Sequence, residues 1–182
     1  MVFNLDPKKL QLFEPLLQRV LIVDPHPAAA RVVSDLIKEM GAKRIVQASG
    51  TLRALDVVQE VEPHVIFVEL TGPELDGLEL TRYLRRSHFV SRGAPVIMMT
   101  SEATAASIMA ARDSGVHEFL RKPFTAGDLF RRVENVITKE RPWIEAKMYV
   151  GPDRRRFNSG AYQGPKKRRV DKGVIEHTLE MA

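Results

Sequence analysis

The chain of 182 residues has no cysteine, a single tryptophan and no long apolar run. Without cysteine there is no disulfide bond, thiolate metal site or thiol nucleophile, and a reducing compartment is expected. No apolar run approaches the roughly 20 residues that span a bilayer, and the N-terminal segment MVFNLDPKKL lacks the apolar core of a signal peptide. These absences predict a cytoplasmic protein with no membrane span.

Positive charge is concentrated near the C-terminus. The chain carries 28 Lys and Arg residues against 23 Asp and Glu residues, a formal net charge of +5. Residues 1–140 contain 18 of each sign, so residues 141–182 hold the remaining 10 basic and 5 acidic residues. A neutral body with a basic appendage predicts an anionic partner for the appendage and a different task for the body.

Apolar segments typical of strands alternate with amphipathic helical segments between residues 19 and 139. Strands are expected at 19–24, 44–48, 65–69, 95–100 and 117–121. Helices are expected at 27–40, 51–60, 77–87, 102–114 and 125–139, the last with Thr125 as N-cap and Asp128 three residues later. Five βα repeats predict an α/β fold with a five-stranded parallel sheet that is doubly wound, with helices on both faces.

Two further segments flank this α/β body. Asp6 and Pro7 suit the start of a short N-terminal helix, which Pro15 interrupts. Beyond residue 141 Gly, Pro, Arg and Lys dominate, which predicts an exposed, largely disordered basic tail, with a short helix at 174–182. The expected organisation is an N-terminal helical extension at 1–18, an α/β domain at 19–140 and a basic tail at 141–182.

Chemically useful side chains are expected where strands of this sheet end. Asp24 ends the first strand, Glu69 the third and Thr100 the fourth, and Lys122 follows the fifth. Because sites in open parallel sheets form at the carboxyl ends of the strands, these side chains are expected to lie close together.

The segment from Arg19 to about Lys139 resembles the receiver domain of bacterial two-component response regulators, the CheY-like (flavodoxin-like) fold. The resemblance rests on VLIVD in the first strand, on the acid followed by x-x-x-P-x-x-D-G-L-E-L, on PVIMMTS in the fourth strand and on KPF after the fifth. It implies a role in phosphorelay signal transduction and a cis peptide bond between Lys122 and Pro123. No residue marks a hydrolytic or redox site, so an enzymatic activity is not expected.

The resemblance assigns roles to the strand-end residues. Glu69 falls where receivers place the phospho-accepting aspartate, and Asp24 falls on the first of two acids that follow the first strand. Lys122 matches the lysine that pairs with the phosphoryl group. Thr100 matches the switch hydroxyl and Phe119 the switch aromatic. Together these positions form a degenerate phosphorylation site.

Two substitutions depart from the family pattern. Pro25 replaces the second acid, which leaves Asp24, Glu69 and Thr71 as a depleted ligand set for Mg²⁺, a cation that dehydrates reluctantly. Glu69 is one methylene longer than the expected aspartate. Since in-line phosphoryl transfer depends on positioning and on the charge of the metal, we expect a pseudo-receiver that is not phosphorylated and that binds Mg²⁺ weakly or not at all.

Glu69 is expected instead to pair with Lys122 and to accept a hydrogen bond from Thr100, which imitates the activated state or locks one state. An ion pair without signalling consequence is one alternative, because buried ion pairs are common without being switches. A phosphotransfer-competent response regulator is another, which Pro25 and Glu69 disfavour. His26 is interpreted as an exposed loop residue rather than a replacement metal ligand.

The resemblance also implies a face that docks a protein partner, formed by the receiver's fourth helix, fifth strand and fifth helix. A flagellar motor component, a histidine kinase or another regulator is the expected kind of partner. The apolar and basic residues of this face are Ile108, Met109, Arg112, Phe119, Arg121, Phe130, Arg131 and Arg132.

Two similar boxes stand in the tail, GPDRRR at 151–156 and GPKKRR at 164–169, with aromatic residues around them. The flat fork of arginine matches O6 and N7 of guanine and stacks on the base, and aspartate accepts from the N1–H and N2–H₂ edge. The tail resembles the arginine-rich stretch of CheY-like cyclic di-GMP effectors. This implies a site for cyclic di-GMP formed by Asp153, Arg154, Arg155, Arg156, Arg168 and Arg169.

Other anionic partners fit the same composition. An acidic protein, a nucleic acid bound through counterion release, and an anionic lipid surface each suit a basic tail, as does a merely solubilising role. The predicted function is a non-enzymatic signalling adaptor, a receiver that is not phosphorylated, docks a protein partner and binds cyclic di-GMP through its tail.

Overall fold

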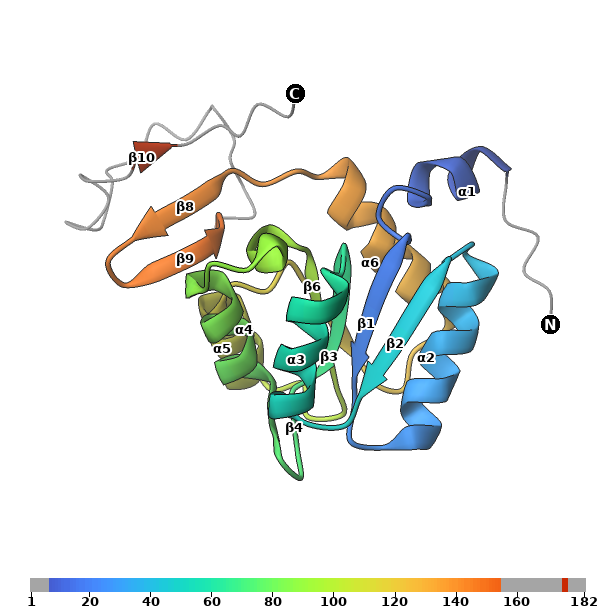
Figure 1. The fold of residues 1–182 in the computed structure, drawn as a ribbon, viewed down its shortest axis with the longest axis horizontal. Coiled ribbons are helices and arrows are strands. Elements are labelled where there is room, and N and C mark those ends of the chain that lie inside the picture. The colour runs from blue at the N-terminus through green and yellow to red at the C-terminus, as the bar shows by residue number, and fades with distance from the viewer. Residues whose placement is uncertain (1–6, 155–174, 177–182) are drawn as a thin grey trace.

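The computed structural model describes residues 7–154 and 175–176. Parallel strands form the centre of the molecule, in the order β2-β1-β3-β6-β7 (Figure 1). They are β1 (Arg19–Val23), β2 (Arg44–Ala48), β3 (Val65–Glu69), β6 (Val96–Thr100) and β7 (Glu118–Arg121). Every residue of β3 and β6 is buried, as expected for central strands covered on both faces. The predicted parallel sheet is confirmed.

Helices cover both faces of this sheet. On one face lie α2 (Pro27–Glu39) and α6 (Ala126–Thr138), and on the other lie α3 (Thr51–Val61), α4 (Gly77–Arg86) and α5 (Ala105–Ser114). Because side chains alternate along a strand, Val20 and Ile22 of β1 enter the first core layer, while Leu21 and Val23 enter the second. The sheet is therefore doubly wound, as expected.

Local sequence signals begin two of the helices. Thr125 and Asp128 form the expected capping box, in which each side chain accepts from the backbone N–H of the other. Thr104 and Ser107 form a second capping box, so α5 begins at Ala105 rather than at residue 102. After β3 the chain makes a tight turn through β4 (Thr71–Gly72) and β5 (Leu75–Asp76). The 3-10 helix η1 (Val90–Gly93) follows α4.

Gly77 lets α4 begin directly against the end of β3. A Cβ atom at this position would lie 2.3 Å from the carbonyl oxygen of Glu69. Its own N–H donates to the carbonyl of Leu70 at 2.9 Å. The D-G pair of the sequence motif therefore fixes how closely the helix approaches the strand end on which Glu69 lies.

The N-terminal helix α1 (Pro7–Phe13) ends before Pro15 and packs beside α6. Phe13 and Leu17 are fully buried in the core layer that α2 and α6 cover. Lys9 of α1 forms a 3.0 Å ion pair with Glu134 of α6. Residues 7–18 are thus part of the folded body.

The chain continues past α6 into a hairpin. Its strands β8 (Trp143–Ala146) and β9 (Tyr149–Pro152) are antiparallel, and β10 (Ile175–Glu176) pairs with the other edge of β8. The hairpin lies against α4 and α5, where Ile144 and Tyr149 are buried (Figure 1). The expectation of an exposed segment without regular structure therefore does not hold for residues 143–152, nor does the expected helix hold for 175–176. Residues 155–174 and 177–182 of the expected tail lie outside the described part.

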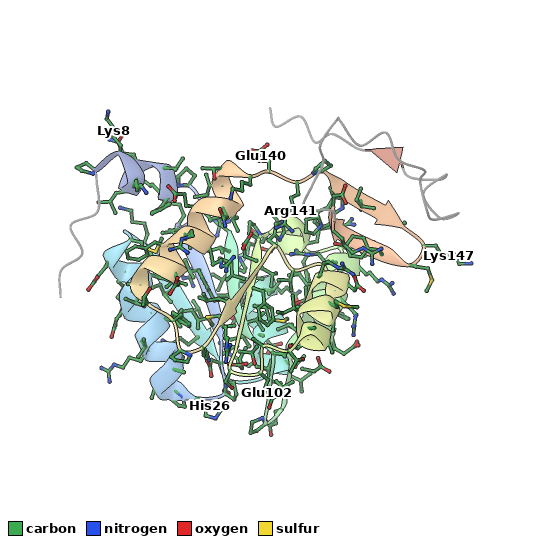
Figure 2. All side chains as sticks on the ribbon, turned by 180° about the vertical axis from the view of Figure 1, so that it is seen from behind. Lys8, His26, Glu102, Glu140, Arg141 and Lys147 are labelled. Carbon is green, nitrogen blue, oxygen red and sulfur yellow. The ribbon has the colours of Figure 1, made fainter. Side chains whose placement is uncertain are left out.

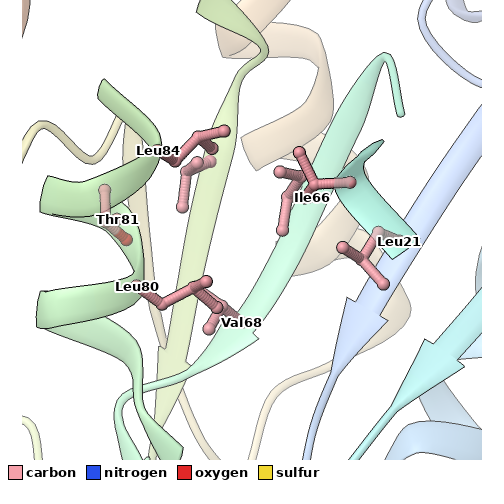
Figure 3. Close-up of a pocket in the computed structure, with 8 residues that line it drawn as sticks. Leu21, Ile66, Val68, Leu80, Thr81 and Leu84 are labelled. Atoms are coloured by element: carbon pink, nitrogen blue, oxygen red, sulfur yellow. The ribbon is translucent and has the colours of Figure 1, made fainter. Parts of the chain in front are cut away.

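A small gap remains in the core between the sheet and helices α3 and α4 (Figure 3). Its volume of about 10 Å³ is close to the least that admits one water molecule. The gap is therefore a packing defect rather than a ligand site. It is lined by Leu21, Val58, Ile66, Val68, Leu80, Thr81, Leu84 and Val96. Within the described residues, no helix is long and apolar enough to cross a membrane.

Candidate functional site

The strand-end residues lie together at the carboxyl edge of the sheet. Asp24 follows β1, Glu69 ends β3, Thr100 ends β6 and Lys122 follows β7. The first three are buried, while the Lys122 side chain is 20% exposed. Figure 2 shows His26, two residues after Asp24, and Glu102, two residues after Thr100, at this end of the molecule.

Lys122 joins the two acids. Its Nζ donates to Asp24 Oδ2 at 2.7 Å and to Glu69 Oε2 at 2.6 Å. Partial burial opposes the charge of the ammonium, but the hydrogen bonds to Asp24 and Glu69 outweigh it and raise the pKa of Lys122. The expected pair between Glu69 and Lys122 is confirmed, and the Lys122–Pro123 peptide bond is cis as expected.

The other carboxylate oxygens also have donors. Asp24 Oδ1 accepts from the backbone N–H of His26 at 2.9 Å, and Glu69 Oε1 accepts from the N–H of Leu70 at 2.8 Å. The imidazole of His26 is 71% exposed, with Nδ1 3.5 Å from Asp24 Oδ1. All four carboxylate oxygens of the two acids are thus engaged within the protein.

Thr100 makes a contact other than the expected one. Its Oγ1 accepts from the backbone N–H of Glu102 at 3.1 Å, and the expected hydrogen bond to Glu69 is not formed. The reason is that the Glu69 carboxylate turns to Lys122 and to its own neighbour Leu70. The second switch position, Phe119 on β7, is half-buried and packs against the core layer beneath α4 and α5.

Pro25 lies beside the acids and carries no ligand atom on its side chain. Its ring approaches the backbone of Gly72 so closely that a Cβ at 72 would lie 2.3 Å from Pro25 Cγ. Thr71, the third expected metal-site position, is exposed on β4. Within residues 7–154, no group of three or more His, Asp or Glu side chains is placed to hold a metal ion.

The expected docking face divides into exposed and buried parts. Ile108 and Met109 of α5 are 41% and 55% exposed, and Arg121 of β7 is also exposed. Phe130 is buried in the core, and Arg132 is tied to the buried Glu118 by a 2.9 Å ion pair. The remaining face residues, Arg112 and Arg131, pair with neighbouring acids on their own helices.

Two of the six expected tail residues lie in the described part. Asp153 is buried, and its backbone N–H donates to the carbonyl of Pro142 at 2.8 Å. Arg154 Nη1 donates to Asp113 Oδ1 on α5 at 2.9 Å, and its guanidinium carbon lies 4.4 Å from the ring centroid of Tyr149. The others, Arg155, Arg156, Arg168 and Arg169, lie outside the described residues.

A buried arginine lies between the α/β body and the hairpin, and the sequence pattern did not single it out. Arg85 of α4 is fully buried and donates to the carbonyl groups of Gly115, Arg92 and Ala94 at 3.0, 2.6 and 2.8 Å. Burial lowers the pKa of Arg85 to about 9, so the side chain stays charged at neutral pH. Its guanidinium carbon lies 5.5 Å from the ring centroid of Trp143 on β8.

Curated proteins with similar sequences are response regulators. The DNA-binding response regulator MtrA of Mycolicibacterium smegmatis is 28% identical over 116 residues, which are 64% of this chain and 49% of MtrA. MtrA of Mycobacterium tuberculosis gives the same identity and coverage. This chain thus spans about half the length of the curated relatives it matches.

Solved structures share the fold. The Vibrio cholerae chemotaxis protein CheY4 has a TM-score of 0.61 at 23% identity, covering 66% of this chain and 98% of CheY4. A receiver domain from Bermanella marisrubri has a TM-score of 0.59 at 26% identity, covering 66% and 98%. The family model of the response regulator receiver domain matches residues 20–134. With this match, the strand order of the sheet and the residues at the strand ends, the chain belongs to the family of response regulator receiver domains.

Proposed function

We propose that this receiver signals without being phosphorylated, as a non-enzymatic adaptor. The observation that carries the proposal is the contact of Lys122 with both Asp24 and Glu69. Glu69 brings a permanent carboxylate to the strand end where the family carries its phospho-accepting aspartate. Because this carboxylate already pairs with the lysine, the arrangement needs no phosphodonor to form or to persist.

The residues present do not fit the Mg²⁺ site of the family. Mg²⁺ demands near-octahedral oxygen ligands, whereas both acids here already accept hydrogen bonds through every carboxylate oxygen. Pro25 offers ring carbons where the family has a second acid. A cation at this place would also have to displace the Lys122 ammonium. We therefore propose that Mg²⁺ binds weakly or not at all.

The protein partner is proposed to dock on α5, β7 and α6. Ile108, Met109 and Arg121 supply exposed apolar and basic groups on this face. Such a surface suits a partner with apolar anchors and acidic neighbours. In the terms of this family, the partner is a flagellar motor component, a histidine kinase or another regulator.

The tail is proposed to bind cyclic di-GMP. The support is chemical, since an arginine-rich segment carries flat donors for two guanines and positive charge for two phosphates. Arg154 already has the stacked geometry that such recognition uses, because its guanidinium lies on the Tyr149 ring. An acidic protein or a nucleic acid is the alternative, and steep salt dependence with affinity that grows with strand length would favour the nucleic acid.

Beryllofluoride with Mg²⁺ imitates a phosphoryl group on an aspartate and tests the proposed independence from phosphorylation. Amide NMR signals of Thr100 and Phe119 in the wild-type protein are expected to stay unchanged on its addition. The double variant Pro25→Asp with Glu69→Asp, which restores the family's acids, is expected to respond. Shifts in the wild-type protein would support the alternative of a phosphotransfer-competent regulator.

A further inference from the structure

We propose that Asp113 on α5 is the receiver-side part of the ligand site, and that it positions Arg154 so that one edge of its guanidinium receives a guanine base. The inference rests on the proposed function, in which cyclic di-GMP is the ligand of the tail. It adds a residue of the receiver body to a site that the sequence placed wholly in the tail.

Asp113 holds Arg154 by one end of the guanidinium. Asp113 Oδ1 accepts from Arg154 Nη1 at 2.9 Å and from Arg112 Nε at 3.1 Å. Partial burial opposes the charge of this carboxylate, but the hydrogen bonds from Arg112 and Arg154 outweigh it and lower the pKa of Asp113. The group is therefore ionised at neutral pH, when it is needed as an acceptor.

Tyr149 supports one face of the same guanidinium. The ring centroid lies 4.4 Å from the guanidinium carbon, a stacked cation–π contact. Tyr149 is itself buried, and its hydroxyl donates to the carbonyl of Pro152 at 2.5 Å, so the ring has a fixed position. A side chain that is both stacked and paired has lost most of its rotamer freedom before a ligand arrives, which lowers the entropy cost of binding.

A second edge of the Arg154 guanidinium is formed by Nε and Nη2. Within the described residues, nothing accepts a hydrogen bond from Nε or Nη2 of Arg154, and the side chain is 32% exposed. Two parallel N–H groups at such an edge match O6 and N7 of guanine. Adenine presents an amino group in place of O6, so this edge discriminates between the two purines.

Close backbone packing holds the two supports of Arg154 at a fixed separation. The hairpin meets the end of α5 through two glycines, and a Cβ on Gly151 would lie 3.0 Å from the Cα of Gly115. Asp113 lies on the same helix as Ile108 and Met109, whose side chains are exposed on the docking face. A base bound to Arg154 is therefore linked through Asp113 to the helix that docks the partner.

Calorimetric titration of the full chain with cyclic di-GMP at near-physiological salt tests the inference. Asp113→Asn is expected to weaken binding about tenfold or more, since it replaces a charge-assisted acceptor by a neutral one. Asp56→Asn is the matched control, because Asp56 forms an exposed ion pair with Arg53 on α3. The affinity of this variant for cyclic di-GMP should equal that of the wild type. Cyclic di-AMP, with the same phosphates, should not bind.

A charge swap separates ligand binding from hairpin docking. Asp113→Arg combined with Arg154→Asp keeps an ion pair between α5 and the hairpin, so amide exchange in 143–152 should match the wild type. Cyclic di-GMP binding should nevertheless be weakened at least as much as in Asp113→Asn. Wild-type affinity in this swap, or unchanged or tighter binding by Asp113→Asn, would overturn the role of Asp113 while leaving the proposed ligand intact. A wild-type chain that binds no cyclic di-GMP would overturn the proposed ligand and this inference together.

Discussion

The ammonium of Lys122 donates a 2.6 Å hydrogen bond to Glu69 Oε2, at the strand end where the receiver family carries its phospho-accepting aspartate. The same ammonium donates to Asp24 Oδ2 at 2.7 Å, so one cation contacts both buried acids. In the proposed function this arrangement replaces a reversible phosphorylation by a permanent ion pair.

Removing the cation should destabilise the fold. In Lys122→Met, the carboxylates of Asp24 and Glu69 face each other without a counter-ion, and we expect a loss of about 2–4 kcal/mol in the free energy of unfolding, somewhat less than for a fully buried pair. Urea denaturation measures this change. Lys38→Met, which removes an exposed pair with Asp35, is the control and should alter stability by less than about 0.5 kcal/mol. Equal effects of the two substitutions would contradict the structural importance of the buried pair.

The docking of the hairpin should depend on Gly151. Its φ of 148° is in a region that L side chains rarely adopt, and a Cβ there would lie 3.0 Å from Gly115 Cα and from the Tyr149 hydroxyl. Gly151→Ala is therefore expected to speed amide hydrogen exchange in residues 143–152. The matched control is Gly93→Ala, because a Cβ at Gly93 has no atom within 4 Å. Unchanged exchange in Gly151→Ala would show that the hairpin does not depend on this close approach.

Stability should fall at acidic pH because of His117. Burial, followed by the charges of Arg85 and Arg141, lowers the pKa of His117 well below its usual value of 6.5. The ring nitrogen Nδ1 lies 3.2 Å from Arg85 Nη2 and 3.3 Å from the N–H of Val96, which fits a neutral ring that accepts at this atom. Below about pH 6.5 the unfolded chain binds a proton at His117 that the folded chain does not bind. The free energy of unfolding therefore decreases by up to about 1.4 kcal/mol for each pH unit below this value.

Denaturant titrations between pH 5 and 8 measure this pH dependence. His117→Gln, which removes the titrating group and keeps a polar side chain, should flatten the slope of stability against pH in the acidic range. His88→Gln alters an exposed histidine and should leave the slope as in the wild type. Identical slopes in all three proteins would mean that His117 does not carry the effect.

Much of the receiver fold was predictable because its signals are local and periodic. The β-branched run before Glu69, the D-G pair at Gly77 and the capping box of Thr125 each specify an element boundary within a few residues. The gathering of Asp24, Glu69 and Lys122 followed from one topological rule, that parallel strands end at the same edge. The side-chain orientation of Glu69 was not predictable, since the choice between Thr100 and Leu70 as its neighbour depends on a rotamer.

The hairpin and its anchors were missed for another reason. WIEA and YVGP alternate around the Lys147–Met148 turn as strands do, but Gly, Pro and basic residues obscured this short pattern. Arg85 and Asp113 are ordinary polar residues on amphipathic helices, and only the docking of a segment distant in sequence gives them partners. Contacts of this kind arise from tertiary packing and produce no periodic pattern in the sequence.

Intact-protein mass spectrometry after incubation with acetyl phosphate and Mg²⁺ tests most directly whether this receiver works without phosphorylation. The wild-type chain is predicted to gain no phosphoryl group, whereas the double variant Pro25→Asp with Glu69→Asp, which restores the family's acids, is predicted to gain one. A phosphoryl group that appears on the wild-type chain and is absent from Glu69→Gln would contradict the proposal. It would identify Glu69 as a working phosphotransfer site.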